Sequence, residues 1–137
     1  MTGYSGTPLV KKIGIKPGRR LAVLNPPPRF ERELAPLPRS VVNADGVPLD
    51  VAILFAASQA ALRKDLSKLA RKLAPAGMLW VAGPNMSSRV STDLNENLVQ
   101  KIGLAAGLVD IKVCAVNEVW SGLKFVFVRR TESRDRE

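Results

Sequence analysis

The sequence contains no histidine and a single cysteine, Cys114, among its 137 residues. Histidine is the commonest general acid or base near neutral pH, and zinc sites are built mainly from cysteine and histidine. One cysteine cannot form an intrachain disulfide. We therefore expect no metal site and no histidine-based catalytic centre, and the sequence shows no pair of catalytic carboxylates at a familiar spacing.

Long hydrophobic runs are also absent. The longest strongly apolar run covers residues 51–57 and is too short to span a bilayer. Residues 1–6 lack the charged-then-apolar pattern of a signal peptide. We expect a cytoplasmic protein without membrane contact, with one domain over residues 1–130 and a polar tail over 131–137.

Glycine is missing where a ligand-binding loop would need it. Residues 21–25 read as a strand, and Pro26, Pro27 and Pro28 follow at once. Loops that bind nucleotide-type ligands after a first strand are rich in glycine, because the backbone turns tightly and presents its N–H groups. Each proline restricts φ and removes an N–H donor. The sequence therefore predicts no bound cofactor at this loop.

The residues that are present indicate alternating strands and helices. Turn residues and hydrophobic periodicity predict helices over 7–14, within 26–38, over 58–73 and over 93–102, and strands over 20–25, 40–43, 50–56, 78–82, 108–117 and 123–129. The last two strands form a hairpin whose loop covers residues 118–122. The expected fold is α/β: a three-layer, Rossmann-like, mostly parallel sheet with a C-terminal antiparallel hairpin.

Four helix ends follow from local sequence signals. Ser58 caps the helix over 58–73, which the turn at residues 75–77 ends. Asp93 and Glu96 have the spacing of a capping box, so Asp93 begins the next helix. Gly103 is expected to close that helix.

Part of the chain resembles S-adenosylmethionine-dependent methyltransferases. The residues that carry this resemblance are the apolar strand 50–55, the leucine-rich helix, and the segment Leu73-Ala-Pro-Ala-Gly77-Met-Leu-Trp-Val81 before a terminal hairpin. The resemblance implies a methyltransferase-like architecture. The chain departs from the family at Asn25-Pro-Pro-Pro28, which replaces the glycine-rich cofactor loop, so no residue is assigned to a methyl-donor site.

Motifs over nearly the whole chain also resemble a bacterial family, the domain of unknown function thirty fifty-two. These motifs are Thr2-Gly-Tyr-Ser-Gly-Thr-Pro-Leu9, Gly14-Ile-Lys16, the loop from Trp80 to Pro84, Gly107-Leu-Val-Asp110, Lys112-Val-Cys-Ala-Val116 and Glu118-Val-Trp-Ser-Gly-Leu123. The resemblance implies a small cytoplasmic bacterial domain. Gly83 stands where that family often has tryptophan, and Asn85 stands where lysine often follows the proline.

Two segments are candidates for a ligand site, namely residues 80–89 and 118–122. Ligands of open α/β sheets bind beyond the carboxyl ends of parallel strands, and the first segment leaves such an end. The candidate ligand-binding residues are Trp80, Pro84, Asn85, Asp93, Glu118, Trp120 and Ser121. The structural alternatives are a helix cap for Asp93, a solvated carboxylate for Glu118 and a core side chain for Trp120.

The net charge of +9 favours an acidic partner, either nucleic acid or an acidic protein. One face of the helix over 59–73 concentrates cations, and these are the candidate nucleic-acid-binding residues: Arg63, Lys64, Lys68, Arg71 and Lys72. The alternative is a solvated face, because no aromatic side chains are interleaved to stack on bases. Cys114 is expected to be a buried, unreactive thiol, although Lys112 shares its face of the strand.

These observations favour a non-catalytic binding or regulatory module. One alternative is an enzyme or a binder of a small anionic ligand that uses the segments 80–89 and 118–122. The other is a sequence-independent nucleic-acid binder, whose contacts would be to phosphates.

Overall fold

The structure is a computed structural model, and it describes residues 9–34, 42–43, 48–85, 91–117 and 119–128. The start of the predicted helix over 7–14, the end of the helix predicted within 26–38, the start of the predicted strand over 40–43 and the carboxylate of Glu118 lie outside the described residues. The same holds for the end of the candidate segment at Arg89 and for the tail over 131–137.

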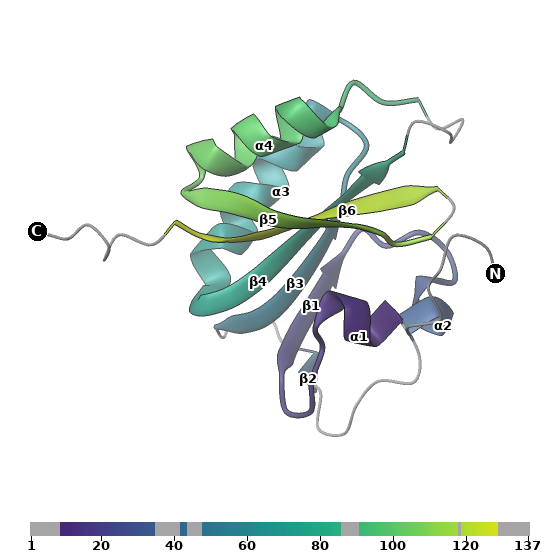
Figure 1. Cartoon of the computed structure of the whole chain (residues 1–137), viewed down its shortest axis with the longest axis vertical. Coiled ribbons are helices and arrows are strands. Elements are labelled where there is room, and N and C mark those ends of the chain that lie inside the picture. The colour runs from purple at the N-terminus through teal and green to yellow at the C-terminus, as the bar shows by residue number, and fades with distance from the viewer. Residues whose placement is uncertain (1–8, 35–41, 44–47, 86–90, 118, 129–137) are drawn as a thin grey trace, which may run out of the picture.

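In the part of the chain that the structure describes, six strands form one mixed sheet (Figure 1). They are β1 Arg20–Leu24, β2 Val42–Asn43, β3 Leu49–Phe55, β4 Leu73–Pro84, β5 Leu108–Ala115 and β6 Trp120–Phe127, in the order β2-β1-β3-β4-β6-β5. The first four strands run parallel, while β6 is antiparallel to both β4 and β5. The mostly parallel sheet with a C-terminal hairpin is thus confirmed.

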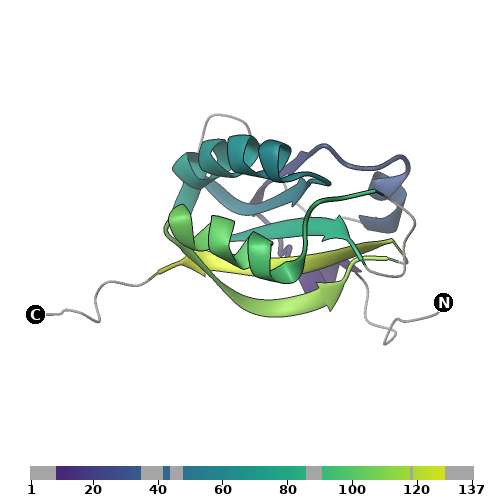
Figure 2. The same ribbon diagram turned by 90° about the horizontal axis from the view of Figure 1, so that it is seen from above.

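Helices cover the two faces of the sheet and give three layers. The helices are α1 Leu9–Ile13, α2 Phe30–Leu34, α3 Gln59–Lys72 and α4 Glu96–Ala105. Alternate residues of β3 divide between two cores: Ala52 and Leu54 pack with α3 and α4, whereas Ile53 and Phe55 pack with α1 and α2. Figure 2 shows α3 above the strands and α1 beneath them.

The leucines of α3 explain its position. Leu62, Leu66 and Leu69 are buried against the sheet, as their spacing predicts. Ser58 caps the helix as expected, since the Ala61 N–H donates to its Oγ at 3.2 Å. Within the described residues no helix is both long and apolar enough to cross a membrane.

The prediction for the ends of α4 is wrong. Asn95, not Asp93, is the N-cap, and its side chain accepts the Leu98 N–H at 2.9 Å. Asp93 instead accepts the Gln59 N–H at 2.8 Å and so caps the first turn of α3. Gly103 lies inside α4, buried against the sheet, and Gly107 with φ of 85° follows the helix.

The strands around the predicted ligand segments are longer than expected. Gly83 and Pro84 pair with Ser121 and Trp120, so β4 extends to Pro84 and β6 begins at Trp120. The predicted turn at residues 75–77 is instead an irregularity within β4, because Leu73 and Met78 pair with Leu49 and Val51 of β3. Pairing of β6 with both β4 and β5 therefore shortens the hairpin loop that was predicted over residues 118–122.

Candidate functional site

The crevice between the carboxyl ends of β1 and β3 is where an open α/β sheet of this order binds ligands. β1 leads to β2 on one side, and β3 leads to β4 on the other, so the strand order reverses here. Asn25 follows β1 with φ of 56°, and its side-chain amide links the end of β3 to α3. The amide Nδ2 donates to the Phe55 carbonyl at 3.5 Å and to Asp65 Oδ2 of α3 at 3.1 Å.

The loop after β1 offers few N–H donors to a ligand. Pro26, Pro27 and Pro28 have none, and the Phe30 N–H already donates to the Pro27 carbonyl at 3.2 Å. Arg29 has φ of 70°, a conformation that is uncommon outside glycine. A glycine-rich phosphate or carboxylate cradle therefore has no counterpart in this loop.

Aromatic side chains fill the region beyond this loop. The Phe30 ring of α2 meets the Phe55 ring of β3 edge-on at a centroid distance of 4.8 Å. Phe55 in turn meets Trp120 of β6 at 5.2 Å, again edge-on. Phe30 and Phe55 are 1% and 2% exposed. This aromatic row, Phe30–Phe55–Trp120, is core packing, and the residues present do not fit a nucleotide-type cofactor.

A pocket lies farther along the same edge of the sheet, at the carboxyl end of β4. Its volume is about 430 Å³. Its walls come from the end of β4, the start of β6, one residue of β5 and the first turn of α4: Val81, Gly83, Pro84, Asn85, Leu94, Asn95, Glu96, Val99, Val113, Ser121, Gly122 and Leu123. We call this space the β4-end pocket.

The β4-end pocket is largely apolar with a few polar groups. Val81 and Leu123 are buried, and Val113 is 55% exposed. The Asn95 side chain is engaged as the α4 cap, and the backbone N–H of Asn85 donates to the Val119 carbonyl at 2.7 Å. The polar side chains of the wall besides Asn95 are the carboxylate of Glu96, the hydroxyl of Ser121 and the amide of Asn85.

The structure brings together only part of the predicted ligand set. Pro84, Asn85 and Ser121 all line the β4-end pocket. Trp80 does not, because it is 1% exposed and its indole N–H donates to the Ile13 carbonyl at 2.9 Å. Asp93 serves as a cap of α3.

Trp120 packs on Phe55, which fits its interpretation as a core side chain. Sequence reasoning included Gly83 in the candidate segment 80–89 but missed Glu96 and Val113 as pocket residues. Glu96 was visible only as the second member of an expected capping box. No local signal places Val113 opposite the first turn of α4, since the pairing of β5 with β6 puts it there.

The cationic residues of α3 lie where the periodicity predicts. Arg63, Lys64, Lys68 and Arg71 are exposed on the side away from the buried leucines, and Lys72 is half-buried. Asp65 on the same helix accepts the Asn25 amide. This placement suits a solvated face and phosphate contacts equally.

Cys114 is half-buried in β5 and packs on the core of α1 and α2. Burial raises the pKa of its thiol, and the charges of Lys12 and Lys112 oppose that rise only in part. A raised pKa disfavours the nucleophilic thiolate. This agrees with the expectation of an unreactive side chain.

Comparison with known proteins assigns a fold. No family model matches the chain, and no curated protein sequence matches it either. Among solved structures, an S-adenosylmethionine-dependent methyltransferase from Aquifex aeolicus aligns with a TM-score of 0.58 and 12% identity, over 88% of each chain. The magnesium protoporphyrin IX methyltransferase from Synechocystis aligns with the same score and identity, over 88% of this chain and 74% of its own.

The fibrillarin pre-rRNA processing protein of Methanococcus jannaschii aligns with a TM-score of 0.52 and 16% identity, over 82% of this chain and 68% of its own. At identities this low, the likeness concerns the fold and not the reaction. The chain therefore has the α/β fold of S-adenosylmethionine-dependent methyltransferases, as its architecture suggested.

Proposed function

We propose that the protein is a non-catalytic binding module built on a methyltransferase-like fold. The observation that carries the proposal is the aromatic row, since Phe30 and Phe55 fill the crevice in which this kind of sheet binds its ligand. The proline loop supports it independently, because it withholds the N–H donors that a cofactor's charged groups need.

Calorimetry with S-adenosylmethionine tests the proposal. We expect no saturable heat at ligand concentrations up to about 1 mM, corresponding to a binding free energy weaker than about −4 kcal/mol. A dissociation constant in the micromolar range would contradict the proposal. So would transfer of a labelled methyl group to any component of a cell extract.

Two variants separate the causes of the expected failure to bind. Phe30→Ala empties part of the aromatic row, and Pro27→Gly restores one N–H donor in the loop. If the row excludes the cofactor, only Phe30→Ala gains measurable binding. If the loop is at fault, only Pro27→Gly does. A circular dichroism spectrum of each variant controls for folding.

A second candidate function is the binding of a small ligand in the β4-end pocket. The observation that favours it is the convergence of Pro84, Asn85 and Ser121 on one largely apolar space of about 430 Å³. Glu96 is the charged side chain of the wall. The pocket therefore suits an apolar ligand that carries a hydrogen-bond donor or a cation better than an anionic one.

Filling the pocket tests this candidate. A Cβ added at Gly83 would meet nothing closer than the Ala56 carbonyl oxygen at 3.7 Å, so Gly83→Trp can project its ring toward the pocket without a backbone clash. Fragments that bind in saturation-transfer NMR should lose their signal with Gly83→Trp. They should keep it with Ala60→Trp, a control on the exposed side of α3.

Equal fragment signals from Gly83→Trp and the unmodified chain would count against the pocket. Membership of the bacterial family and a cytoplasmic location remain predictions from the sequence. The proposed function depends on neither.

A further inference from the structure

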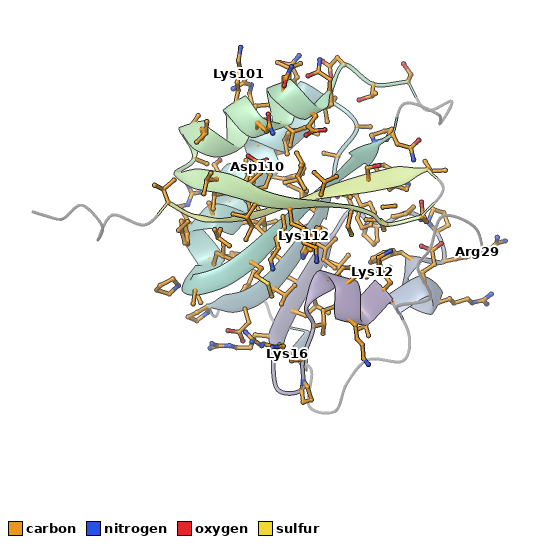
Figure 3. The ribbon with its side chains drawn as sticks, in the orientation of Figure 1. Lys12, Lys16, Arg29, Lys101, Asp110 and Lys112 are labelled. Atoms are coloured by element: carbon orange, nitrogen blue, oxygen red, sulfur yellow. The ribbon has the colours of Figure 1, made fainter. Side chains whose placement is uncertain are left out.

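Lysines from three parts of the chain gather on the side of the sheet that carries α1. We call Lys12, Lys16, Lys112 and Lys124 the β5–β6 lysine cluster. Figure 3 shows Lys12, Lys16 and Lys112 on this side, whereas Lys101 lies away from them on α4. Lys112 of β5 and Lys124 of β6 are directly paired across the strands, an arrangement in which like charges repel.

The pKa of Lys124 is sensitive to the neighbouring positive charges. Burial lowers the pKa of its ammonium group, and the charges of Lys112 and Lys16 lower it further. Lys12 and Lys112 both act on the thiol of Cys114, which lies two residues along β5 from Lys112. Four cations are therefore close enough to influence the same few groups.

No carboxylate within the described ranges neutralises the ammonium groups of Lys16, Lys112 or Lys124. The ion pair between described residues joins Arg20 and Asp50 at 3.1 Å, outside the cluster. No described acidic side chain lies within 4 Å of the Lys16, Lys112 or Lys124 ammonium groups. Uncompensated like charges are unfavourable in the isolated protein. An anionic partner would remove that repulsion on binding.

An apolar groove of about 920 Å³ adjoins the cluster. Lys124 and Val126 lie two residues apart on β6 and share a face. Ile111 lies next to Lys112 at the irregularity in the pairing of β5 with β6. The groove continues past the start of β4 to the end of β6, and its walls include Pro75, Ala76, Gly77, Ile111, Val126 and Val128. Ile111 is 56% exposed and Val128 is 46% exposed.

We propose that the lysine cluster and its groove together dock an acidic, leucine-rich segment of a partner protein. This inference rests on the proposed function and names its partner class. Carboxylates of the segment meet Lys112 and Lys124, and aliphatic side chains cover Ile111 and Val126. The same surface suits nucleic acid less well, since its groove is apolar and the large exposed side chains of the described residues include no aromatic ring for stacking.

Fluorescence anisotropy with a short labelled peptide of alternating glutamate and leucine tests the proposal. We expect saturable binding in about 50 mM salt that weakens as salt is raised. The double variant Lys112→Gln/Lys124→Gln should weaken binding about tenfold or more, because two charge contacts are lost. The matched variant Lys64→Gln/Lys68→Gln on α3 should change it less than about twofold.

Ile111→Ser should also weaken the binding of the glutamate–leucine peptide. A glutamate–serine peptide should bind poorly to the unmodified chain. The lysine variant should unfold at the same temperature as the unmodified chain or a higher one, because it removes a repulsion. Loss of binding therefore cannot be assigned to misfolding.

Three results would overturn the inference: no saturable binding of the glutamate–leucine peptide, equal binding of the glutamate–serine peptide, or equal loss with the α3 variant. Tighter binding of a DNA duplex that is lost with Lys112→Gln/Lys124→Gln would reassign the surface to nucleic acid. Binding of S-adenosylmethionine would contradict the proposed function instead, and the lysine substitutions would leave it unchanged.

Discussion

At the scale of single residues, Gly103 shows how packing overrides a local signal. A Cβ at this position would lie 2.3 Å from Cε1 of Phe125, whose ring is fully buried in β6. Gly103→Ala should therefore lower the free energy of unfolding by about 1–3 kcal/mol, although alanine is the better helix former by about 1 kcal/mol. Urea denaturation measures the change.

The second variant Phe125→Leu shows whether that clash is the cause. Combined with Gly103→Ala, it should cost less than the sum of the two single changes, because the smaller side chain leaves room for the new methyl group. A Gly103→Ala protein as stable as the unmodified chain would contradict the close approach of α4 to β6.

Asp50 is the residue whose ionisation should be visible in the stability of the fold. Its carboxylate accepts the Arg20 backbone N–H at 2.9 Å and pairs with the Arg20 guanidinium, and this side-chain hydrogen bond lowers the pKa of Asp50 below 3.8. A lowered pKa stabilises the folded state above the ordinary value, and that stability is lost as pH falls through the folded-state value.

Asp50→Asn should thus cost about 0.5–1 kcal/mol at pH 7, a modest figure because Arg20 is 40% exposed and solvent screens the pair. The difference from the unmodified chain should shrink as pH falls below 3.8. Urea denaturation at several pH values measures it. A constant difference from neutral to acidic pH would mean that the lost interaction is not ionic.

At the scale of helices, the two caps near residue 94 make separable contributions. Asn95→Ala should destabilise the start of α4, and Asp93→Ala the start of α3, each by about 1 kcal/mol, since each side chain accepts one N–H there. Hydrogen exchange distinguishes them: the first change should speed exchange at Leu98, and the second at Gln59. Faster exchange at Glu96 with Asp93→Ala would instead support the capping box expected from the sequence, in which Asp93 accepts the Glu96 N–H.

This pair of caps also shows where sequence reasoning stops. The leucines of α3 repeat at helical spacing behind Ser58, so its position could be predicted from local signals alone. Asp93 and Asn95 are equally good cap residues, and only the path of the loop over α3 decides between them. The mostly parallel character of the sheet followed from the alternation of elements, whereas the bounds of β4 and β6 depended on long-range pairing.

The same reason limits prediction of the candidate site. The proline loop was visible in the sequence because its chemistry is local. The aromatic row joins Phe30, Phe55 and Trp120 from three separate elements, and the β4-end pocket joins β4, β5, β6 and α4. Neither grouping has a local pattern. The position of residues 80–89 after a strand pointed to Pro84 and Asn85 as ligand residues, but nothing in the sequence places Glu96 or Val113 beside them or Phe30 against Phe55.

At the scale of the whole molecule, one sheet shared by two cores implies that the domain unfolds as a unit. Neighbouring residues of β3 belong to opposite cores, so neither core persists without the strands that build the other. α1 and α2 have five residues each, too few for independent stability, whereas α3 and α4 have 14 and 10. We therefore expect a single cooperative transition.

Two probes report separately on the two cores. Trp80 and Trp120 both lie in the core of α1 and α2, so tryptophan fluorescence follows that side, while far-UV circular dichroism is dominated by α3 and α4. Their urea midpoints should coincide. Leu66→Ala in one core and Val23→Ala at the edge of the other should each shift both midpoints together, with an unchanged m-value. Leu66→Ala should lower the free energy of unfolding by about 2–4 kcal/mol. Fluorescence that changes before circular dichroism would show that the α1 and α2 layer opens by itself, and the aromatic row would then be a removable cover over the crevice.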